Sequence, residues 1–273
     1  MGNINNGIPI RVRQIGGVRI MKKLIIFALI VLMVSSFASA ALVDDIFLYY
    51  TFDNADLTGS DPDDMTGNGY NGNNVGATTG AAGIIGQSFD YDGTSDYVTA
   101  DSTWTWLNEF DAEGKSWCFW FNTDEDTLFQ ALSVTRDADN IPQFEMMATG
   151  LGNAKDTQRS LLRGDSNTGP LVSSSETVNT GTWYHWCGTW NLTSDTLTNY
   201  LDGVSVGSSS TAIGTVSQYG AAEPVTFGAR NSGGSFSSFY EGYIDEVGMW
   251  DRTLNSAEIV SLYNGGAGCA WST

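Results

Sequence analysis

The sequence contains few positively charged residues, a single histidine, three cysteines and five prolines among its 273 residues. Its 12 Lys and Arg residues are outnumbered by 31 Asp and Glu residues, which gives a net charge of −19. Nucleic-acid binding requires clusters of Lys and Arg that displace counterions from phosphates; the sequence has none, so nucleic acid is excluded as a partner. A zinc site of His and Cys would have to draw on four residues scattered along the chain.

Hydrophobic and aromatic residues, by contrast, are plentiful. They make up 41% and 12% of the chain respectively, which is enough to bury a core and excludes intrinsic disorder. The composition indicates an acidic globular domain whose function must lie in its loops and carboxylates.

Residues 1–40 have the pattern of a signal peptide. Lys22 and Lys23 precede an apolar stretch over 24–34, and Ala38-Ser39-Ala40 is a small-residue cleavage pattern. An uncleaved anchor running on through Val43 is the alternative, but eleven apolar residues are short of the roughly twenty that span a membrane. We predict export to the exterior or the cell surface, with cleavage after Ala40 and no membrane association afterwards.

Cleavage would make the remaining chain, 41–273, more acidic. Five positive residues and no acid lie within 1–40, so the mature chain would carry a net charge of −24. Eleven of its acids fall between Asp44 and Asp101, although solubility alone could account for such an excess.

Export would permit a disulfide bond. Cys118 and Cys187 both lie in aromatic, strand-like runs, where they can form a bridge or remain buried thiols. Because the count is odd, one cysteine, such as Cys269, is left over.

Short apolar runs separated by Gly, Asn, Asp and Ser predict an all-β, antiparallel, two-sheet jelly-roll sandwich in one domain. Only 255–264 has helical spacing, with Ser256 as its expected N-cap. The polar segment 54–86 is either a ligand cage or a solvated loop. The expected strands are 46–52, 87–91, 95–99, 116–122, 128–134, 142–148, 182–190, 196–206, 224–229 and 239–250.

Six sequence blocks resemble parts of one known family. They are YYTFD at 49–53, GNGYNG at 67–72, SFDYDG with DYV at 88–98, WYHWCGTW at 183–190, YLDGV at 200–204, and GYIDEV with WDRTL at 242–254. In this order they are similar to the LamG-like (laminin G, concanavalin A-like) jelly-roll family, over about 46–264.

The resemblance implies a non-catalytic module that binds extracellular glycans or surface proteins and often carries calcium. In such jelly rolls the first and last strands lie side by side, which would bring Asp53 near Asp245. Calcium prefers carboxylate, amide and carbonyl oxygens, so Asp53, Asn68 and Asp245 are the expected ligands, with Asp92 in reserve. The alternative is that these residues only form turns.

Exposed aromatics are the expected glycan contacts. Trp104 and Trp106 would point to the same side of an extended segment, unless they cap the core. Further candidates lie in or beside Gly/Ser loops: Tyr219, Phe236, Phe239 and Tyr240.

Two rival classes remain. The same sandwich hosts glucanases, whose acids alternate along one strand face. Here Glu241, Tyr243 and Asp245 share a face whereas Glu246 points away, so no catalytic pair is evident. His185, mid-strand, is expected to be a core residue rather than a base for Ser205. The third class is a structural component of a cell envelope or virion surface, which nothing in the sequence excludes.

Overall fold

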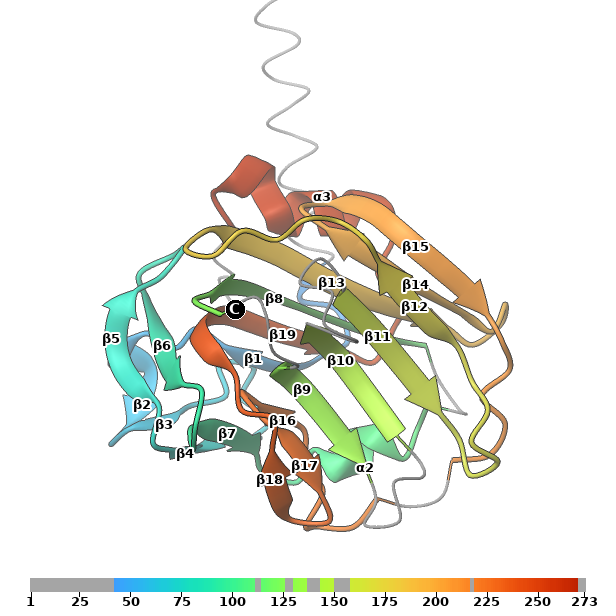
Figure 1. Cartoon of the computed structure of the whole chain (residues 1–273), viewed down its shortest axis with the longest axis horizontal. Coiled ribbons are helices and arrows are strands. Elements are labelled where there is room, and N and C mark those ends of the chain that lie inside the picture. Colours follow the sequence, from blue (N-terminus) through green and yellow to red (C-terminus); the bar gives the residue numbers. More distant parts are fainter. Residues whose placement is uncertain are drawn as a thin grey trace, which may run out of the picture.

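The computed structural model describes residues 42–110, 114–125, 130–136, 143–149, 158–216 and 219–269. The predicted signal peptide over 1–40 lies outside these residues. Within them, no helix is long and apolar enough to cross a membrane. The fold is the expected all-β sandwich, with strands β9 to β12 lying in front of β8, β13 and β19 in Figure 1.

The larger sheet has eight strands in the order β15-β14-β13-β8-β19-β6-β5, with β1 also paired to β19. Its neighbouring strands are antiparallel. The strands are β1 (Ile46–Tyr50), β5 (Thr78–Ala82), β6 (Gln87–Asp92), β8 (Lys115–Thr123), β13 (Trp183–Asn191), β14 (Thr196–Leu201), β15 (Val204–Ser210) and β19 (Glu241–Trp250).

The second sheet has six strands in the order β12-β11-β10-β9-β17-β18. One pair, β17 with β9, is parallel, which the antiparallel prediction did not include. The strands are β9 (Gln130–Arg136), β10 (Gln143–Thr149), β11 (Gln158–Arg163), β12 (Leu171–Ser174), β17 (Arg230–Ser232) and β18 (Ser235–Ser237).

The side chains of β8 alternate between the two faces of the large sheet, and both faces are buried. Trp117, Phe119 and Phe121 point into the core between the sheets, so Cys118 and Trp120 lie on the outer face of the large sheet. Both sets of side chains are at most 2% exposed, because a helix covers part of the outer face.

That helix is α3 (Ser256–Tyr263), above the large sheet in Figure 1. Ile259 and Leu262 pack with Cys118 and Cys187 in a second hydrophobic cluster. The N-cap is Asn255 rather than the predicted Ser256. Its side chain accepts from the backbone N–H groups of Ala257 and Glu258, and Glu258 completes a capping box.

Two parts of the chain differ from the sequence-based expectations. The polar segment 54–86 contains short strands, and DSTWTW forms a turn that leads into a short helix rather than an extended segment. These elements are η1 (Asn54–Asp56), β2 (Leu57–Thr58), β3 (Asp61–Pro62), β4 (Gly72–Val75) and α2 (Trp104–Leu107), with β4 pairing to β7 (Tyr97–Ala100) and β7 in turn to β16 (Thr226–Phe227).

Candidate functional site

Four carboxylates gather where β1 ends beside β19; we call Asp53, Asp56, Asp245 and Glu246 the acidic centre. The two strands are antiparallel, with Tyr50 opposite Val247. The Asp53 charge acts on both Asp245 and Glu246, and the Asp56 charge acts on Glu246. The first and last strands therefore bring Asp53 and Asp245 together, as the family resemblance implied.

A β-bulge places two consecutive acids on the outer face of β19. Ile244 and Val247 both pack in the core between the sheets, although they are three residues apart. The register shifts between Asp245 and Gly248, and Glu246 has a positive φ of 53°. The prediction that Glu246 points to the opposite face from Asp245 was therefore wrong, because strict alternation along a strand does not allow for a bulge.

The loop between β5 and β6 is held by two of these carboxylates. Oδ2 of Asp245 accepts hydrogen bonds from the backbone N–H of Ile84 (2.8 Å) and Ile85 (3.2 Å), and Oδ1 of Asp53 accepts from Gln87 N–H (2.5 Å). The close approach requires glycine: a Cβ at Gly83 would lie 2.4 Å from Asp245 Oδ2, and one at Gly86 2.2 Å from Asp53 Oδ1.

Burial destabilises negative charge in the acidic centre. Desolvation, with a smaller contribution from the Asp53 charge, raises the pKa of Asp245 to about 8. Desolvation also raises the pKa of Glu246 to about 8, although Tyr49 donates its hydroxyl hydrogen to this carboxylate. The centre therefore favours a proton, or a cation, at these oxygens.

The chemistry of the donors fits a hard cation. Asp245 is fully buried, and its Oδ1 has no hydrogen-bond partner. Because calcium takes oxygen ligands from carboxylates and backbone carbonyls, Asp245 and Asp53 are the residues that would hold it. In the part of the chain that the structure describes, no three carboxylates of the centre lie within 4.8 Å of one another, so carbonyl or water oxygens would have to complete the shell.

Asn68 and Asp92, the other two predicted metal ligands, lie elsewhere. Nδ2 of Asn68 donates to the carbonyls of Ile46 (3.1 Å) and Phe47 (3.0 Å), at the opposite end of β1 from Asp53. Asp92 lies opposite Glu241 at the end of β6. Its carboxylate accepts hydrogen bonds within the 92–96 turn. Asp92 therefore stabilises a turn, which was the alternative to a role as a calcium ligand.

Asn68 instead lines an open polar pocket of about 350 Å³. Two acids of this pocket, Glu109 and Asp251, pair with the buried Lys115, whose Nζ lies 3.2 Å and 2.8 Å from their carboxylate oxygens. The pocket is lined by Asp45, Ile46, Phe47, Asn68, Tyr70, Thr105, Glu109 and Asp251.

Three of the six predicted glycan-contacting aromatics belong to the core. Trp106 and Tyr240 are fully buried and Tyr219 is 3% exposed, so these predictions were wrong. The side chain of Trp104 lies outside the described residues. Phe236 is partly exposed and stacks on Tyr97, with ring centroids 3.9 Å apart.

Phe239, the remaining candidate, is also partly exposed. Hydrophobicity cannot separate a core ring from a ligand-binding ring, since both roles use the same residue types.

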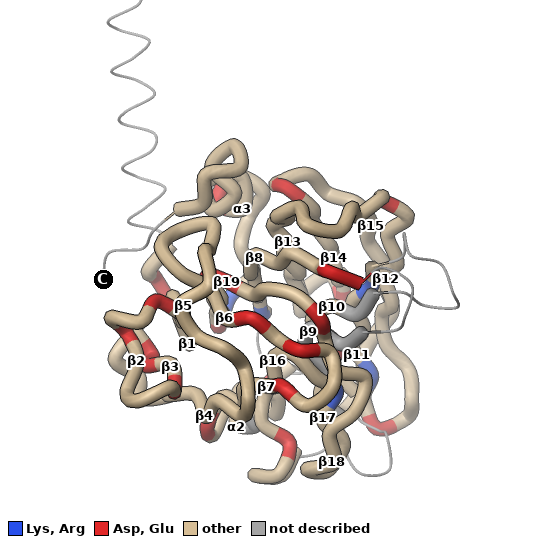
Figure 2. Tube along the Cα trace, turned by 60° about the vertical axis from the view of Figure 1, so that its left-hand side comes forward, with Lys and Arg blue, Asp and Glu red and all other residues tan. Residues whose placement is uncertain are grey.

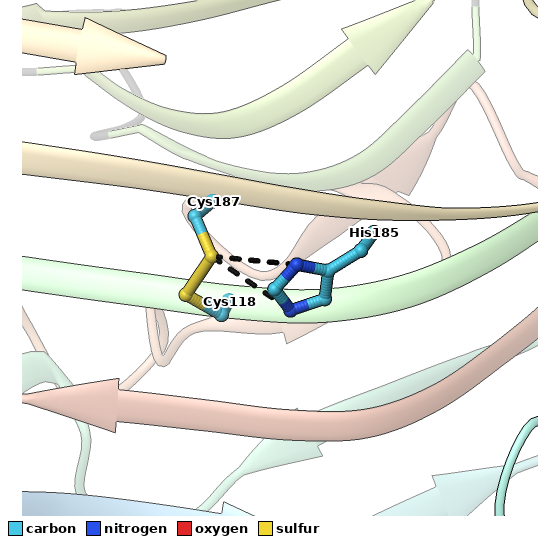
Figure 3. Close-up of side chains that lie close together, drawn as sticks. All are labelled: Cys118, His185 and Cys187. Atoms are coloured by element: carbon cyan, nitrogen blue, oxygen red, sulfur yellow. Dashed lines mark hydrogen bonds between the residues drawn. A yellow bond between two sulfur atoms is a disulfide. The ribbon is translucent and has the colours of Figure 1, made fainter. Parts of the chain in front are cut away.

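The structure joins Cys118 to Cys187 through a disulfide bond, between residues opposite each other on β8 and β13. Figure 3 shows His185 beside it, with its ring nitrogens 3.9 Å and 3.8 Å from Cys187 Sγ. The sequence suggested scattered His and Cys residues, whereas the fold gathers these three within 4.8 Å. Metal ions bind cysteine in its thiolate form. Because the sulfurs of Cys118 and Cys187 are joined in a disulfide, they do not form a metal site with His185. His185 is buried, as predicted.

Figure 2 marks acidic residues along the chain at β3 and β6. In the eight strands of the large sheet, the only Lys or Arg is Lys115.

Known structures share this fold. The binding domain of Paraclostridial mosquitocidal protein 1 superposes with a TM-score of 0.60 at 12% identity, covering 82% of this chain and 53% of that one. The binding domain of botulinum neurotoxin serotype D superposes with a TM-score of 0.57 at 14% identity, and the match covers 84% of this chain and 53% of that one. The chain thus spans about half the length of these toxin domains.

A third structure matches over almost its whole length. Domain 4 of AbnA, an extracellular arabinanase from Geobacillus stearothermophilus solved with arabinotriose, superposes with a TM-score of 0.56 at 19% identity. The match covers 79% of this chain and 97% of that domain. Comparison with curated protein sequences gave no match.

The family model for the concanavalin A-like lectin/glucanase superfamily matches residues 92–260. This range covers more than half of the chain and includes three of the six blocks that resemble LamG-like domains, with part of a fourth. The chain belongs to the concanavalin A-like lectin/glucanase superfamily.

Proposed function

We propose that the protein is an exported, non-catalytic binding module that recognises a glycan or another extracellular surface ligand and carries a structural calcium ion. The family and the fold support binding as the general role. Among the structures that share the fold, one is named as a complex with arabinotriose and others as toxin binding domains. Fold alone does not fix the ligand.

The acidic centre is the observation that carries the calcium proposal. Asp245 combines full burial with an unpartnered Oδ1, and buried polar atoms of this kind require an explanation such as an ion. A cation between Asp53 and Asp245 would offset their mutual repulsion. It would also fix the Gly83–Gln87 loop, whose backbone both residues already hold.

The same geometry supports a non-catalytic role. A retaining glycosidase needs two carboxyl groups about 5–5.5 Å apart that flank the scissile bond. Asp245 lies under the Gly83–Gln87 loop and Glu246 is engaged with Tyr49, so neither carboxylate is available to a polysaccharide. Glu241 remains exposed at the start of β19 and is the acid to mutate if hydrolysis occurs.

Two measurements test this proposal. Glycan-array binding of the purified protein, with turnover assays on β-glucan, alginate and laminarin, should show binding without turnover. Turnover that the Glu241→Ala substitution abolishes would establish the enzyme instead. A thermal shift in calcium against chelator tests the ion independently, and an unchanged Tm would remove it from the proposal.

A further inference from the structure

A row of polar and aromatic side chains crosses five strands on the outer face of the large sheet. The cross-strand register places Trp183 opposite Asn122, Asn122 opposite Tyr243, Tyr243 opposite Asp90, and Asp90 opposite Thr78. Directly opposed residues share a face.

This face is the outer one. The chain neighbours Phe121, Ile244 and Phe89 all pack in the core between the sheets, so Asn122, Tyr243 and Asp90 point away from it. We call Trp183, Asn122, Tyr243 and Asp90 the outer platform.

The two aromatic rings lean together over the strand between them. Trp183 on β13 and Tyr243 on β19 are separated by β8, so their backbones are roughly 9–10 Å apart. Their ring centroids are only 6.3 Å apart, with an interplanar angle of 50°. Both rings are partly exposed, so they form an apolar surface that solvent can reach.

Asn122 lies on the strand between these two rings, and its amide oxygen, Oδ1, has no hydrogen-bond partner. The residue is 9% exposed. A buried amide oxygen without a partner costs about 1–3 kcal/mol, so such atoms commonly bind a water or a ligand. This oxygen is covered in the structure, so a water or ligand hydroxyl has to enter between the two rings to donate to it.

Within the described part of the chain, the helix that covers this face contacts the neighbouring row of side chains. The row two residues further along β13 and β8 contains His185 and Trp120, on which Tyr263 of α3 stacks with centroid distances of 6.2 Å and 5.8 Å. Trp183 and Tyr243 lie just beyond this cover.

The electrostatics define the class of ligand. Asp90 belongs to the platform, and Asp92, Asp124 and Glu241 lie at the adjoining strand ends; Figure 2 shows the acids along β6. The only Lys or Arg in the eight strands, Lys115, is buried at the far end of β8. Carboxylated or sulfated sugars would be repelled.

We infer that the outer platform binds a neutral oligosaccharide, with a sugar face stacked on Trp183 and Tyr243 and a hydroxyl donated to Asn122 Oδ1. Sugar rings combine an apolar C–H face with hydroxyl edges, which matches two rings that flank an amide, with a carboxylate beyond Tyr243. Asp90 accepts from a further hydroxyl. The inference rests on the proposed glycan-binding function and names the surface and the ligand class.

The test begins with an array of neutral oligosaccharides (arabino-, xylo-, gluco- and galacto-series) and anionic ones (uronic and sulfated), applied to the full protein. Calorimetry with the tightest neutral glycan then follows for Trp183→Ala and Tyr243→Ala. We expect affinity to fall about tenfold or more in each, as on truncation of a central aromatic contact. Tyr97→Ala, which alters a partly exposed ring on β7 rather than on the platform, is the matched control and should retain affinity.

Asn122→Leu keeps the test valid if an aromatic variant fails to fold. It removes the unpartnered oxygen, so Tm should stay the same or rise while glycan affinity falls. Undiminished affinity in Trp183→Ala and Asn122→Leu would overturn the platform but leave the glycan-binding function standing. No binding of any glycan by the wild type would overturn both.

Two further outcomes would also contradict the inference. Selective binding of anionic glycans would contradict the ligand class. A wild-type dimer that Trp183→Ala converts to a monomer in light scattering would show that the platform is covered by a second copy of the chain.

Discussion

Asp53 and Asp245 hold opposite ends of one loop: Asp245 accepts from Ile84 and Ile85 at its start, and Asp53 accepts from Gln87 at its end. One residue follows the first strand and the other lies on the last. The loop itself connects β5 to β6, so the acidic centre ties together three distant parts of the chain.

The substitution Asp245→Asn should abolish calcium stabilisation without unfolding the protein. A cation bound only to the folded state stabilises by about 2.7 kcal/mol at about 100 times its Kd, and this increment should vanish in the variant. In chelator at pH 8 the variant should be at least as stable as the wild type, because a neutral amide avoids the cost of burying a charge. The measurement is Tm with calcium and with chelator.

Asp92→Asn is the matched control, since Asp92 lies in a turn apart from the acidic centre. It should keep the full calcium shift. An equal loss of the shift in both variants would mean that calcium acts through general acidity rather than at Asp245.

Calcium stabilisation should also grow as pH rises. Asp245 and Glu246 have folded pKa values of about 8, above the roughly 4 of the unfolded chain. The folded state therefore binds more protons between pH 4 and 8, and without calcium its stability falls as pH rises through this window.

A cation replaces those protons, so the calcium-induced rise in Tm should be larger at pH 8.5 than at pH 5.5. Thermal scans at the two pH values in calcium and in chelator measure it. Equal increments at both would place the ion away from these two carboxyls.

The strand pattern of this chain was predictable because core residues alternate with outer ones. Runs such as IFLYYTF and SWCFWF carry aromatic and β-branched side chains that fit a half-buried pleated surface. The strands missed at 158–163 and 171–174 are rich in Ser, Arg and Gln. Their pairing depends on neighbours far away in the chain, which no local pattern contains.

The candidate site was predictable only where it depends on strand adjacency. Asp53 and Asp245 come together because the first and last strands pair. Glu246 was missed because the bulge that turns it outward has no local sequence signal, and the loop glycines Gly83 and Gly86 acquire their role only from the carboxylates packed against them. Trp183 and Tyr243 meet over a third strand, a relationship that requires the sheet order.

Replacing both bridged cysteines, Cys118→Ala with Cys187→Ala, should destabilise the protein strongly. The disulfide spans 69 positions of sequence, and loop-closure entropy for that length is worth about 4 kcal/mol. Denaturant unfolding of the double variant should show this loss. Cys269→Ser, which leaves the bridge intact, should unfold close to the wild-type midpoint. A double variant as stable as the wild type would show that the two sulfurs are not bonded in the mature protein.

His185 should make the protein sensitive to acid. Desolvation lowers the pKa of its buried imidazole to about 3, below the roughly 6.5 of an unfolded chain. Between these values the unfolded state binds a proton that the folded state does not, so the contribution of His185 to stability rises with pH and is lost as pH falls below about 6.5. The slope from this residue is about 1.4 kcal/mol per pH unit near pH 5.

The substitution His185→Phe should flatten this dependence while preserving the stack with Trp120 and Tyr263. At pH 7 it should unfold near the wild-type midpoint, whereas at pH 4.5 it should be the more stable of the two. Because the chain has a single histidine, its imidazole proton resonance can be followed by NMR without ambiguity. A folded-state titration near pH 6.5 would contradict the burial of this ring, and with it the packing of α3 across the disulfide.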